Sequence, residues 1–306
     1  MKRVRQIRIK KNMSVNPLVK EMSGSGVMGA GRIAKAADIM EAMIKDSQCR
    51  VFLGIAGALV PGGMKQIIID MLKKGWVDVI VTTGATLTHD LVEALGYSHY
   101  QGRPDLNDAE LNKKQIDRIY DSFMPNKVYG GLEDFFVRHF DEINQEKDIK
   151  SFLWKLGSLV PKKSQKNSIL ATCASQKIPL FCPAISDSGI GLMIWGRLAA
   201  GKKIDVGAFE DMKEMLRLAW DAKKAGVVYL GGGVPKNYIQ QAMQFSKDSA
   251  SYGVQITMDR PEPGGSSGAE LREGRTFFFL TSVSFMQSLC ARIIGNGMNS
   301  GVSSVA

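Results

Sequence analysis

Residues 77–86 read VDVIVTTGAT, and this stretch decides the fold. Its first part, Val77 to Val81, is a short run of mostly β-branched apolar residues, which is typical of a buried strand. Hydroxyls and a glycine follow at residues 82–86, and a helical pattern then runs from His89 to Leu95. A buried strand that leads into a helix through a glycine loop is the repeating unit of parallel α/β sheets.

The same unit recurs along the chain. We expect further strands at Val51 to Ala56, Ile178 to Cys182, Val227 to Leu230 and Val254 to Thr257. We expect other helices at 31–46, 63–74, 109–119, 131–145, 148–157, 166–175, 207–224 and from Lys236 onward. No long linker interrupts the series, so we predict a single α/β domain over residues 14–306, with a largely parallel sheet and helices on both faces. Its glycine-rich loops follow strands, where open sheets bind ligands.

The net charge of +10 is concentrated near the two ends of the chain. Residues 1–12 contain six basic side chains and no acidic one: Lys2, Arg3, Arg5, Arg8, Lys10 and Lys11. Residues 274–306 add Arg275 and Arg292, again without an acid. The body between them is close to neutral, which argues against a nucleic-acid-binding face. We interpret residues 1–13 as a basic, disordered arm.

The sequence also argues against a membrane or secreted protein. No stretch reaches the roughly 20 apolar residues of a membrane span, and the basic start has no apolar segment behind it. The four cysteines form no C-x-x-C pair: Cys49, Cys173, Cys182 and Cys290. Scattered cysteines in a chain this long are typical of reduced core residues, which predicts a cytoplasmic location.

Residues 24–29, GSGVMG, match the pattern G-x-G-x-x-G. A dinucleotide fingerprint follows a strand, whereas residues Pro17 to Met22 do not have a strand pattern. We therefore favour a flexible entry to a helix over a phosphate site. The three histidines, His89, His99 and His139, are not spaced as metal ligands, and we predict no metal site.

Two other loops are better placed for binding. The hydroxyls and amides of residues 82–86 could hold a phosphate or ribose, although Thr86 or Thr88 could equally cap the following helix. The triple glycine, residues 231–233, either lets a ligand approach the backbone or forms a tight turn before Pro235, and we favour the ligand.

Asp187 and a second glycine-rich stretch each allow two interpretations. The carboxylate of Asp187 follows a predicted strand, where it could bind a ribose hydroxyl or a cation, or could only form a turn. Residues 264–268 could form a ligand loop or a flexible connection.

Six segments in this order resemble the deoxyhypusine synthase family: VFLGIAGALVPGGM, VDVIVTTGATLTHDLVEALG, RIYDSFMPNKVYGGLEDFF, IPLFCPAISDSGIG, VVYLGGGVPKNYI and GGSSGAELRE. The resemblance covers roughly residues 14–273. It implies a Rossmann-like fold and a homotetramer with NAD bound near subunit contacts. It further implies transfer of the aminobutyl group of the polyamine spermidine to a lysine of a translation initiation factor.

The resemblance also implies roles for particular residues. The positions that match the family's NAD contacts are Gly57, Ala58, Thr83, Gly84, Asp187 and Gly232. Glu273 matches an active-site carboxylate of the family.

Three positions depart from the family on the substrate side. Leu192 stands in place of the aspartate of a Gly-Asp-Met motif, Asn237 in place of a histidine, and Ser266 in place of an aspartate. Because these changes remove groups that could hold a cationic amine, we expect weak spermidine binding.

The largest departure follows Glu273. The family continues with Ser-Trp-Gly-Lys, and that lysine forms an imine with the transferred group, whereas residues 274–279 here read GRTFFF. No lysine occurs after Lys247. A frameshifted reading frame and a divergent tail both explain this. Three functions remain open: an impaired NAD-dependent aminobutyl transferase, a related polyamine enzyme such as a homospermidine synthase, and a non-catalytic NAD-binding relative.

Overall fold

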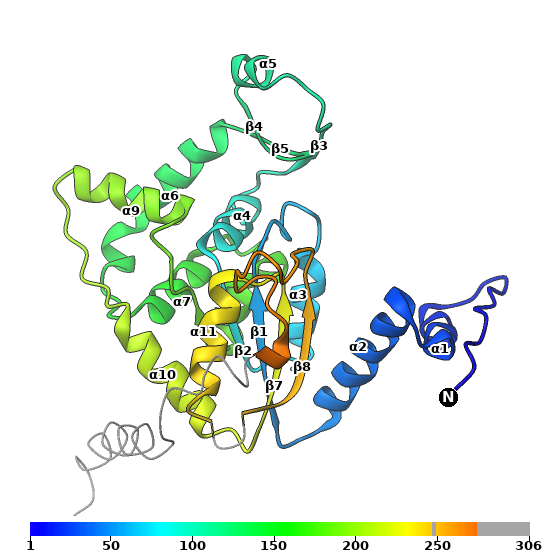
Figure 1. Ribbon diagram of the computed structural model, residues 1–306. Helices are drawn as coiled ribbons and strands as arrows, with labels where there is room; N and C mark the ends of the chain where they lie inside the picture. The colour runs from blue at the N-terminus through cyan, green and yellow to red at the C-terminus, as the bar shows by residue number, and fades with distance from the viewer. Residues whose placement is uncertain (247–248, 274–306) are drawn as a thin grey trace, which may run out of the picture.

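The computed structural model describes residues 1–246 and 249–273 (Figure 1). Its centre is a five-stranded sheet in which every neighbouring pair of strands is parallel. The strands lie in the order β6 (Leu180–Phe181), β2 (Val79–Thr82), β1 (Cys49–Ile55), β7 (Lys224–Leu230) and β8 (Ala250–Ile256). The predicted α/β fold with a largely parallel sheet is confirmed.

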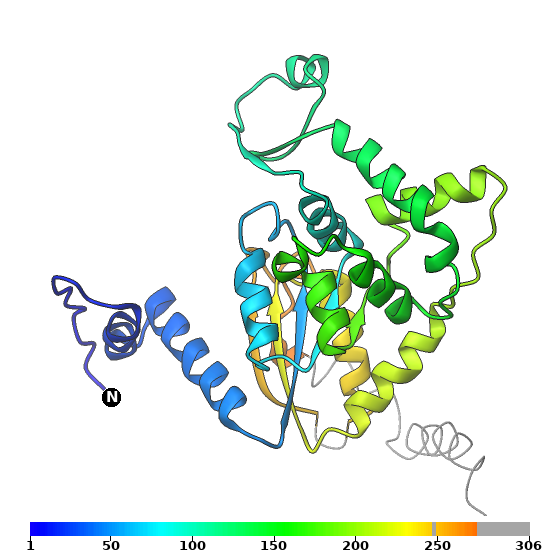
Figure 2. The same cartoon turned by 180° about the vertical axis from the view of Figure 1, so that it is seen from behind.

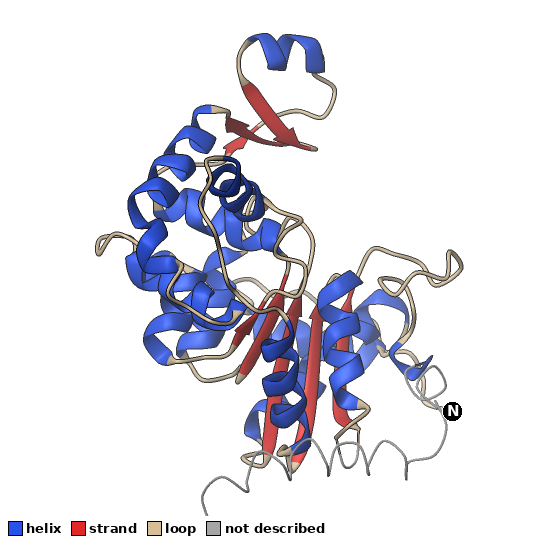
Figure 3. Cartoon of the chain, turned by 90° about the vertical axis from the view of Figure 1, so that its left-hand side faces the viewer, coloured by secondary structure: helices blue, strands red, loops and turns tan. Residues whose placement is uncertain are grey.

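Side chains from each central strand alternate between two apolar layers. Leu53 packs into the layer on one face, whereas its neighbour Phe52 packs into the other. The first layer is completed by α2 (Met28–Lys45), α3 (Lys65–Lys73), α4 (Gly84–Ala94), α6 (Lys127–Ile143), α7 (Ile149–Leu159), α8 (Ile169–Gln176) and α9 (Gly189–Ala199). The second is completed by α10 (Phe209–Trp220) and α11 (Gly233–Met243). Helices therefore cover both faces, as predicted, and the rotated views show the sheet between them (Figures 2 and 3).

The direction of sheet growth reverses beside β1. The chain first adds β2 and β6 on one side of β1, and then returns to add β7 and β8 on the other side. In open α/β sheets such a reversal leaves a crevice at the carboxyl ends of the two strands involved. Here those ends lead into residues 56–58 after β1 and 231–233 after β7.

A small antiparallel sheet was not predicted from the sequence. It consists of β3 (Tyr100–Gln101), β5 (Ser122–Pro125) and β4 (Ile116–Ile119), with the short helix α5 (Asp108–Lys113). The expected helix over 109–119 is wrong beyond Lys113, because Gln115 adopts a positive φ of 57° and the chain turns into β4. These strands are two to four residues long, and β5 buries the adjacent Phe123 and Met124, so no apolar alternation showed them.

The N-terminal region is a pair of helices that stands to one side of the sheet (Figure 1). Helix α1 (Val15–Ser25) was not predicted, and Gly26 and Val27 join it to α2. The G-x-G-x-x-G match at residues 24–29 therefore spans the end of α1 and the start of α2, and no strand precedes it. The basic arm before α1 is exposed, and the backbone N–H of Arg5 donates to the carbonyl oxygen of Gly24 at 3.3 Å.

Helix α9 was also missed, because its start, Gly189-Ile190-Gly191, has the composition of a loop. Two short 3₁₀ helices, η1 (Gln165–Asn167) and η2 (Leu271–Glu273), complete the described structure. None of the described helices combines the length and apolar character needed to span a membrane.

Candidate functional site

The first part of the candidate site is the start of α4, directly after β2. The Thr83 hydroxyl oxygen accepts a hydrogen bond from the Thr86 backbone N–H at 3.4 Å, so Thr83 is the N-cap. The sequence had offered Thr86 or Thr88 as the cap and had treated residues 82–86 as a loop, and both expectations are wrong because the helix begins at Gly84. Free amides at a helix N-terminus favour an anion such as a phosphate.

The start of α9 packs directly on the start of α4. A Cβ placed on Gly84 would lie 2.5 Å from the Ser188 hydroxyl oxygen, so only glycine fits there. The Thr88 hydroxyl oxygen also accepts from the Ile190 backbone N–H at 3.1 Å. This contact brings Asp187, which is exposed beside Ser188, to the same edge as Thr83 and Gly84.

The loop after β1 is open. Gly57 has a φ of 80°, a conformation that favours glycine, and a Cβ placed on it would meet nothing within 4 Å. Gly57 and Ala58 are both exposed. The carboxyl ends of the parallel strands form one edge of the sheet, which we call the carboxyl edge. A ligand at this edge could therefore approach the backbone at Gly57.

The loop after β7 is covered by another part of the chain. A Cβ on Gly232 would lie 2.4 Å from the Cα of Ser267, so the close approach at this glycine is made by the protein itself. The Gln255 side-chain N–H₂ holds the two loops together, since it donates to the carbonyl oxygens of Gly231 at 3.1 Å and Ser267 at 2.8 Å. Residues 264–268 are thus tied to the triple glycine, and the NAD contact at Gly232 stays a prediction.

Lys236 lies beneath this covering loop, in the first turn of α11. It is 1% exposed, and its Nζ donates to the Gln255 Oε1 at 2.9 Å and to the Ala269 carbonyl oxygen. Burial lowers the pKa of Lys236, and the charge of Glu273 opposes that shift. Lys236 and Glu273 therefore belong to one electrostatic environment, although Glu273 itself is exposed on η2. A buried amine with a lowered pKa is a candidate for chemistry on amines or carbonyl compounds.

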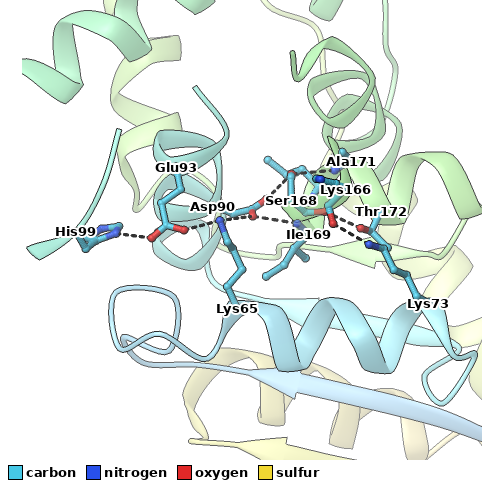
Figure 4. Close-up of polar contacts among 11 residues, drawn as sticks. Lys65, Lys73, Asp90, Glu93, His99, Lys166, Ser168, Ile169, Ala171 and Thr172 are labelled. Atoms are coloured by element: carbon cyan, nitrogen blue, oxygen red, sulfur yellow. Dashed lines mark hydrogen bonds and ion pairs between the residues drawn. The ribbon is translucent and has the colours of Figure 1, made fainter. Parts of the chain in front are cut away.

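A series of polar contacts runs along the second half of α4 and past its end (Figure 4). Lys65 at the start of α3 forms an ion pair with Glu93, and the other Glu93 oxygen lies 2.8 Å from His99 Nδ1. His99 Nε2 lies 2.9 Å from His89 Nδ1. The sequence analysis did not predict these contacts because it considered the histidines only as possible metal ligands. One available signal was the spacing of His89 and Glu93, which are four residues apart on one helix.

Asp90 anchors the same region from within the core. Its carboxylate accepts from the Ser168 hydroxyl at 2.8 Å and from the backbone N–H groups of Ile169 and Leu170, each at 2.9 Å. These are the first residues of α8, so a side chain of α4 caps a distant helix (Figure 4). Burial raises the pKa of Asp90, and the two backbone N–H groups oppose that shift.

The positions that depart from the family pattern lie around the same edge. Leu192 is 57% exposed on α9, Asn237 is half-buried on α11, and Ser266 is exposed in the covering loop. Within the described ranges, no group of His, Cys, Asp and Glu side chains is arranged to hold a metal ion. A hollow of about 440 Å³ between α7 and α8 contains none of the predicted site residues.

The three described cysteines, Cys49, Cys173 and Cys182, are free thiols. Burial raises the pKa of the Cys49 thiol to about 11 and that of Cys182 to about 12. These thiols have little thiolate character at neutral pH, so they do not contribute a nucleophile to the site. Cys290 lies outside the described residues.

The fold defines a class, an open doubly wound α/β protein whose glycine-rich loops lie at the carboxyl ends of its strands. The sequence profile of the family "DS: Deoxyhypusine synthase" matches residues 17–285. The chain belongs to the deoxyhypusine synthase family. The matched range runs past Glu273, so the resemblance does not stop at that residue, where the segments recognised in the sequence ended.

Archaeal relatives share this length and pattern. The protein named probable deoxyhypusine synthase 1 of Methanosarcina acetivorans is 44% identical over 275 residues, which cover 90% of this chain and 85% of the relative. The protein of the same name from Archaeoglobus fulgidus is 36% identical over 90% of this chain and 88% of the relative.

A solved structure supports the fold. The crystal structure of a provisionally assigned deoxyhypusine synthase from Entamoeba histolytica superposes with a TM-score of 0.60. The superposition covers 95% of this chain and 96% of that one, at 17% sequence identity. At this identity the likeness concerns the fold alone.

Proposed function

We propose that this chain is a deoxyhypusine synthase-like, NAD-dependent aminobutyl transferase that acts on a polyamine, and that the sequence as it stands is impaired in the transfer step. The acceptor in this proposal is a lysine of a translation initiation factor. The observation that carries the proposal is the open edge formed by Gly57, Thr83, Gly84 and Asp187 in a chain of this family.

The residues at the open edge suit NAD. The α4 N-terminus and the Thr83 hydroxyl offer donors to a pyrophosphate, and the exposed Asp187 carboxylate suits a ribose hydroxyl. Gly57 leaves the backbone open to close approach. When bound, NAD supplies a hydride acceptor, while the protein supplies position and charge.

The part of the site that would hold the amine carries little negative charge. Glu273 is a carboxylate near Lys236 that could face a cationic amine. Leu192, Asn237 and Ser266 offer no negative charge, so we propose that spermidine binds weakly compared with a family member that has acidic residues at the first and last of these positions. A dissociation constant for spermidine in the low micromolar range would contradict this.

The covalent step needs a lysine that this sequence does not have in the family's position. Residues after Lys247 contain no lysine, and Arg275 cannot take its place because a guanidinium stays protonated. We therefore propose negligible transfer to an acceptor. A related polyamine enzyme and a non-catalytic NAD-binding protein remain the alternative functions.

We further propose a cytoplasmic homotetramer. One face of α9 exposes apolar side chains that a subunit contact would bury: Leu192 at 57%, Trp195 at 65% and Leu198 at 44%. Light scattering should give four chains at micromolar concentration, and Trp195→Glu should lower the assembly state. A wild-type monomer at that concentration would contradict the proposal.

Calorimetry with NAD tests the cofactor proposal. We expect binding by the wild-type protein, weaker binding by Asp187→Ala, and wild-type binding by Asp205→Ala, which removes an exposed aspartate from the segment between α9 and α10. The absence of both heat and a thermal shift at millimolar NAD would reject the site.

Borohydride trapping tests the covalent step. Incubation with NAD and labelled spermidine, followed by reduction, should leave no labelled protein. A labelled peptide would overturn the prediction, and the peptide that contains Lys236 would be the first to examine because this amine is buried beside Glu273.

A further inference from the structure

We propose that a face rich in lysine, which lies at the amino ends of β2 and β6, binds an acidic segment of a partner protein. We call it the lysine face, and it consists of six exposed residues: Lys73, Lys74, Lys162, Lys163, Lys166 and Lys177. Neither the six family segments nor the proposed cofactor site contains any of them.

The sequence concentrates positive charge in this part of the chain. Residues 149–186 contain six lysines and no aspartate, glutamate or arginine. The body of the chain is close to neutral only because acidic residues elsewhere balance this stretch. Charge gathered in this way forms a local positive potential wherever the fold keeps the lysines together.

The fold brings three segments together on this face. Lys73, at the end of α3, donates from Nζ to the carbonyl oxygen of Lys166 at 2.7 Å, a contact drawn in Figure 4. Lys73 and Lys177 both line a hollow of about 390 Å³. Lys177 also lines the larger hollow between α7 and α8, together with Gln165 of η1. The loop that contains η1 therefore lies beside the residues that precede β2 and β6.

The rest of the protein does not pair with these charges. Across the described ranges, none of the six lysines forms an ion pair, whereas Lys150 in the same stretch pairs with Glu214. Like charges that lie together without counter-charges repel one another, and an anionic partner removes that repulsion.

The carboxylates around the face are fewer than its lysines. Glu146 lines the larger hollow, Asp78 lines the smaller one, and Asp70 lies on α3. The Asp78 carboxylate also accepts from the Val51 backbone N–H at 2.7 Å, which fixes its position. The face therefore keeps an excess of positive charge.

Two features favour a protein segment over a nucleic acid. Neither hollow is lined by arginine, the residue that binds phosphate through paired hydrogen bonds. Ammonium groups already lie over the two aromatic rings beside the face. Lys177 Nζ is 5.0 Å from the centroid of the Trp154 ring, and Lys74 Nζ is 4.8 Å from that of Trp76. These rings are therefore poor platforms for stacked bases.

The larger hollow suits an acidic side chain. It has a volume of about 440 Å³ and is lined by the apolar groups of Trp154, Ala171 and Ala174 as well as by Lys155 and Lys177. A glutamate that enters it meets amines with its carboxylate and apolar atoms with its carbon stem.

The lysine face lies at the opposite end of the sheet from the carboxyl edge. Lys74 and Lys177 precede β2 and β6, whereas Thr83 and Asp187 follow the same strands. Substitutions on this face should therefore leave NAD affinity unchanged. For the same reason, the inference does not depend on the proposed function.

Fluorescence anisotropy with labelled poly-L-glutamate tests the binding. We expect the wild-type chain to bind this peptide, with affinity falling about tenfold as salt rises from ~0.05 M to ~0.2 M. The triple variant Lys162→Glu, Lys163→Glu, Lys166→Glu should bind at least about tenfold more weakly. The matched control, Lys113→Glu, Lys114→Glu, Lys203→Glu, changes the net charge equally at exposed positions elsewhere and should stay close to wild type.

Carbodiimide crosslinking, mapped by mass spectrometry, locates the peptide, because it joins carboxylates to the amines that they contact. We expect crosslinks at Lys162, Lys163, Lys166 or Lys177. Crosslinks confined to the basic arm at residues 1–12 would reject the lysine face, as would equal losses of affinity in the triple variant and its control.

A labelled RNA of the same length distinguishes the partner class. We expect it to bind no more tightly than the peptide. RNA binding at least about tenfold tighter than peptide binding, and lost in the triple variant, would assign the face to nucleic acid and overturn the proposal. The absence of peptide binding by the wild-type chain at low salt would overturn it as well.

Discussion

The carboxyl edge has two parts, the loops after β1 and β2 and the loop after β7. They differ in whether another part of the protein covers their glycines. After β1, Gly57 is open, and after β2 the α4 N-terminus directs its amides outward. After β7, Gly232 is covered by Ser267 of the same chain. Both loops have the same sequence signal, glycine directly after a buried strand. The difference shows that this signal marks close backbone approach without saying whether a ligand or the protein makes it.

The two sides also hold their buried charges differently. On the open side, Asp90 has three hydrogen-bond donors and Lys65 has carboxylate partners. On the covered side, Lys236 donates to the neutral oxygens of Gln255 and Ala269. Well-paired charges serve structure, whereas burial lowers the pKa of Lys236 despite the opposing charge of Glu273, which brings its amine closer to reactivity.

The largest effect should come from removing Asp90. Asp90→Ala leaves the Ser168 hydroxyl and two backbone N–H groups at the start of α8 without their acceptor. The free energy of unfolding should fall by ~3–5 kcal/mol. Urea denaturation measures this, and Asp70→Ala, at an exposed position of α3, should change stability by less than ~0.5 kcal/mol. Equal effects of the two substitutions would show that the α4–α8 contact contributes nothing.

A side chain at position 232 should displace the loop that covers the residues after β7. Gly232→Ala places a Cβ 2.4 Å from the Cα of Ser267, so the covering loop must move. We expect a loss of ~2–3 kcal/mol in denaturation. Limited proteolysis should also cleave residues 259–268 faster than in the wild type. Gly264→Ala, in the same loop but with open space around the Cβ, controls for backbone effects, because its φ of 74° gives it strain without a clash.

Asp211 is a second buried carboxylate, which can be compared with Asp90. It is 5% exposed, and its Oδ1 accepts from the Lys150 backbone N–H at 3.1 Å. Burial raises the pKa of Asp211 to about 7, so the fold favours the neutral acid. Its contribution to stability is therefore present at pH 4 and is lost as pH rises toward 7 and above.

Asp211→Asn should remove that pH dependence. The variant should be more stable than the wild type by ~1–2 kcal/mol at pH 8, with the difference vanishing near pH 4. Thermal unfolding at several pH values measures this, with Asp205→Asn as an exposed control. A constant difference across the pH range would contradict the raised pKa.

The smallest effect on stability should come from the open side. Gly57→Ala meets no atom but forces a side chain into a φ of 80°, which should cost ~1 kcal/mol. NAD affinity should fall more than stability does, because the methyl group points into the space left for a ligand. Unchanged NAD affinity in a folded variant would place the cofactor elsewhere.

The sequence by itself determined the parallel sheet, its two-sided helical cover and the edge at which its loops gather. Apolar runs followed by glycine loops are local patterns, and such patterns report local structure directly. They also carried the family resemblance, which the profile match and the archaeal relatives confirm. The small sheet β3–β5–β4 was not predicted because its strands are too short to show an apolar alternation.

Only the tertiary structure decided which groups meet. Asp90 caps a helix 78 residues further along the chain, His89 pairs with His99 across the end of α4, and Ser267 covers Gly232. Each contact joins residues whose own surroundings in the sequence carry no sign of the partner. The physical reason is that hydrogen bonds and steric contacts depend on distances in space, which are set only when the helices pack on the sheet.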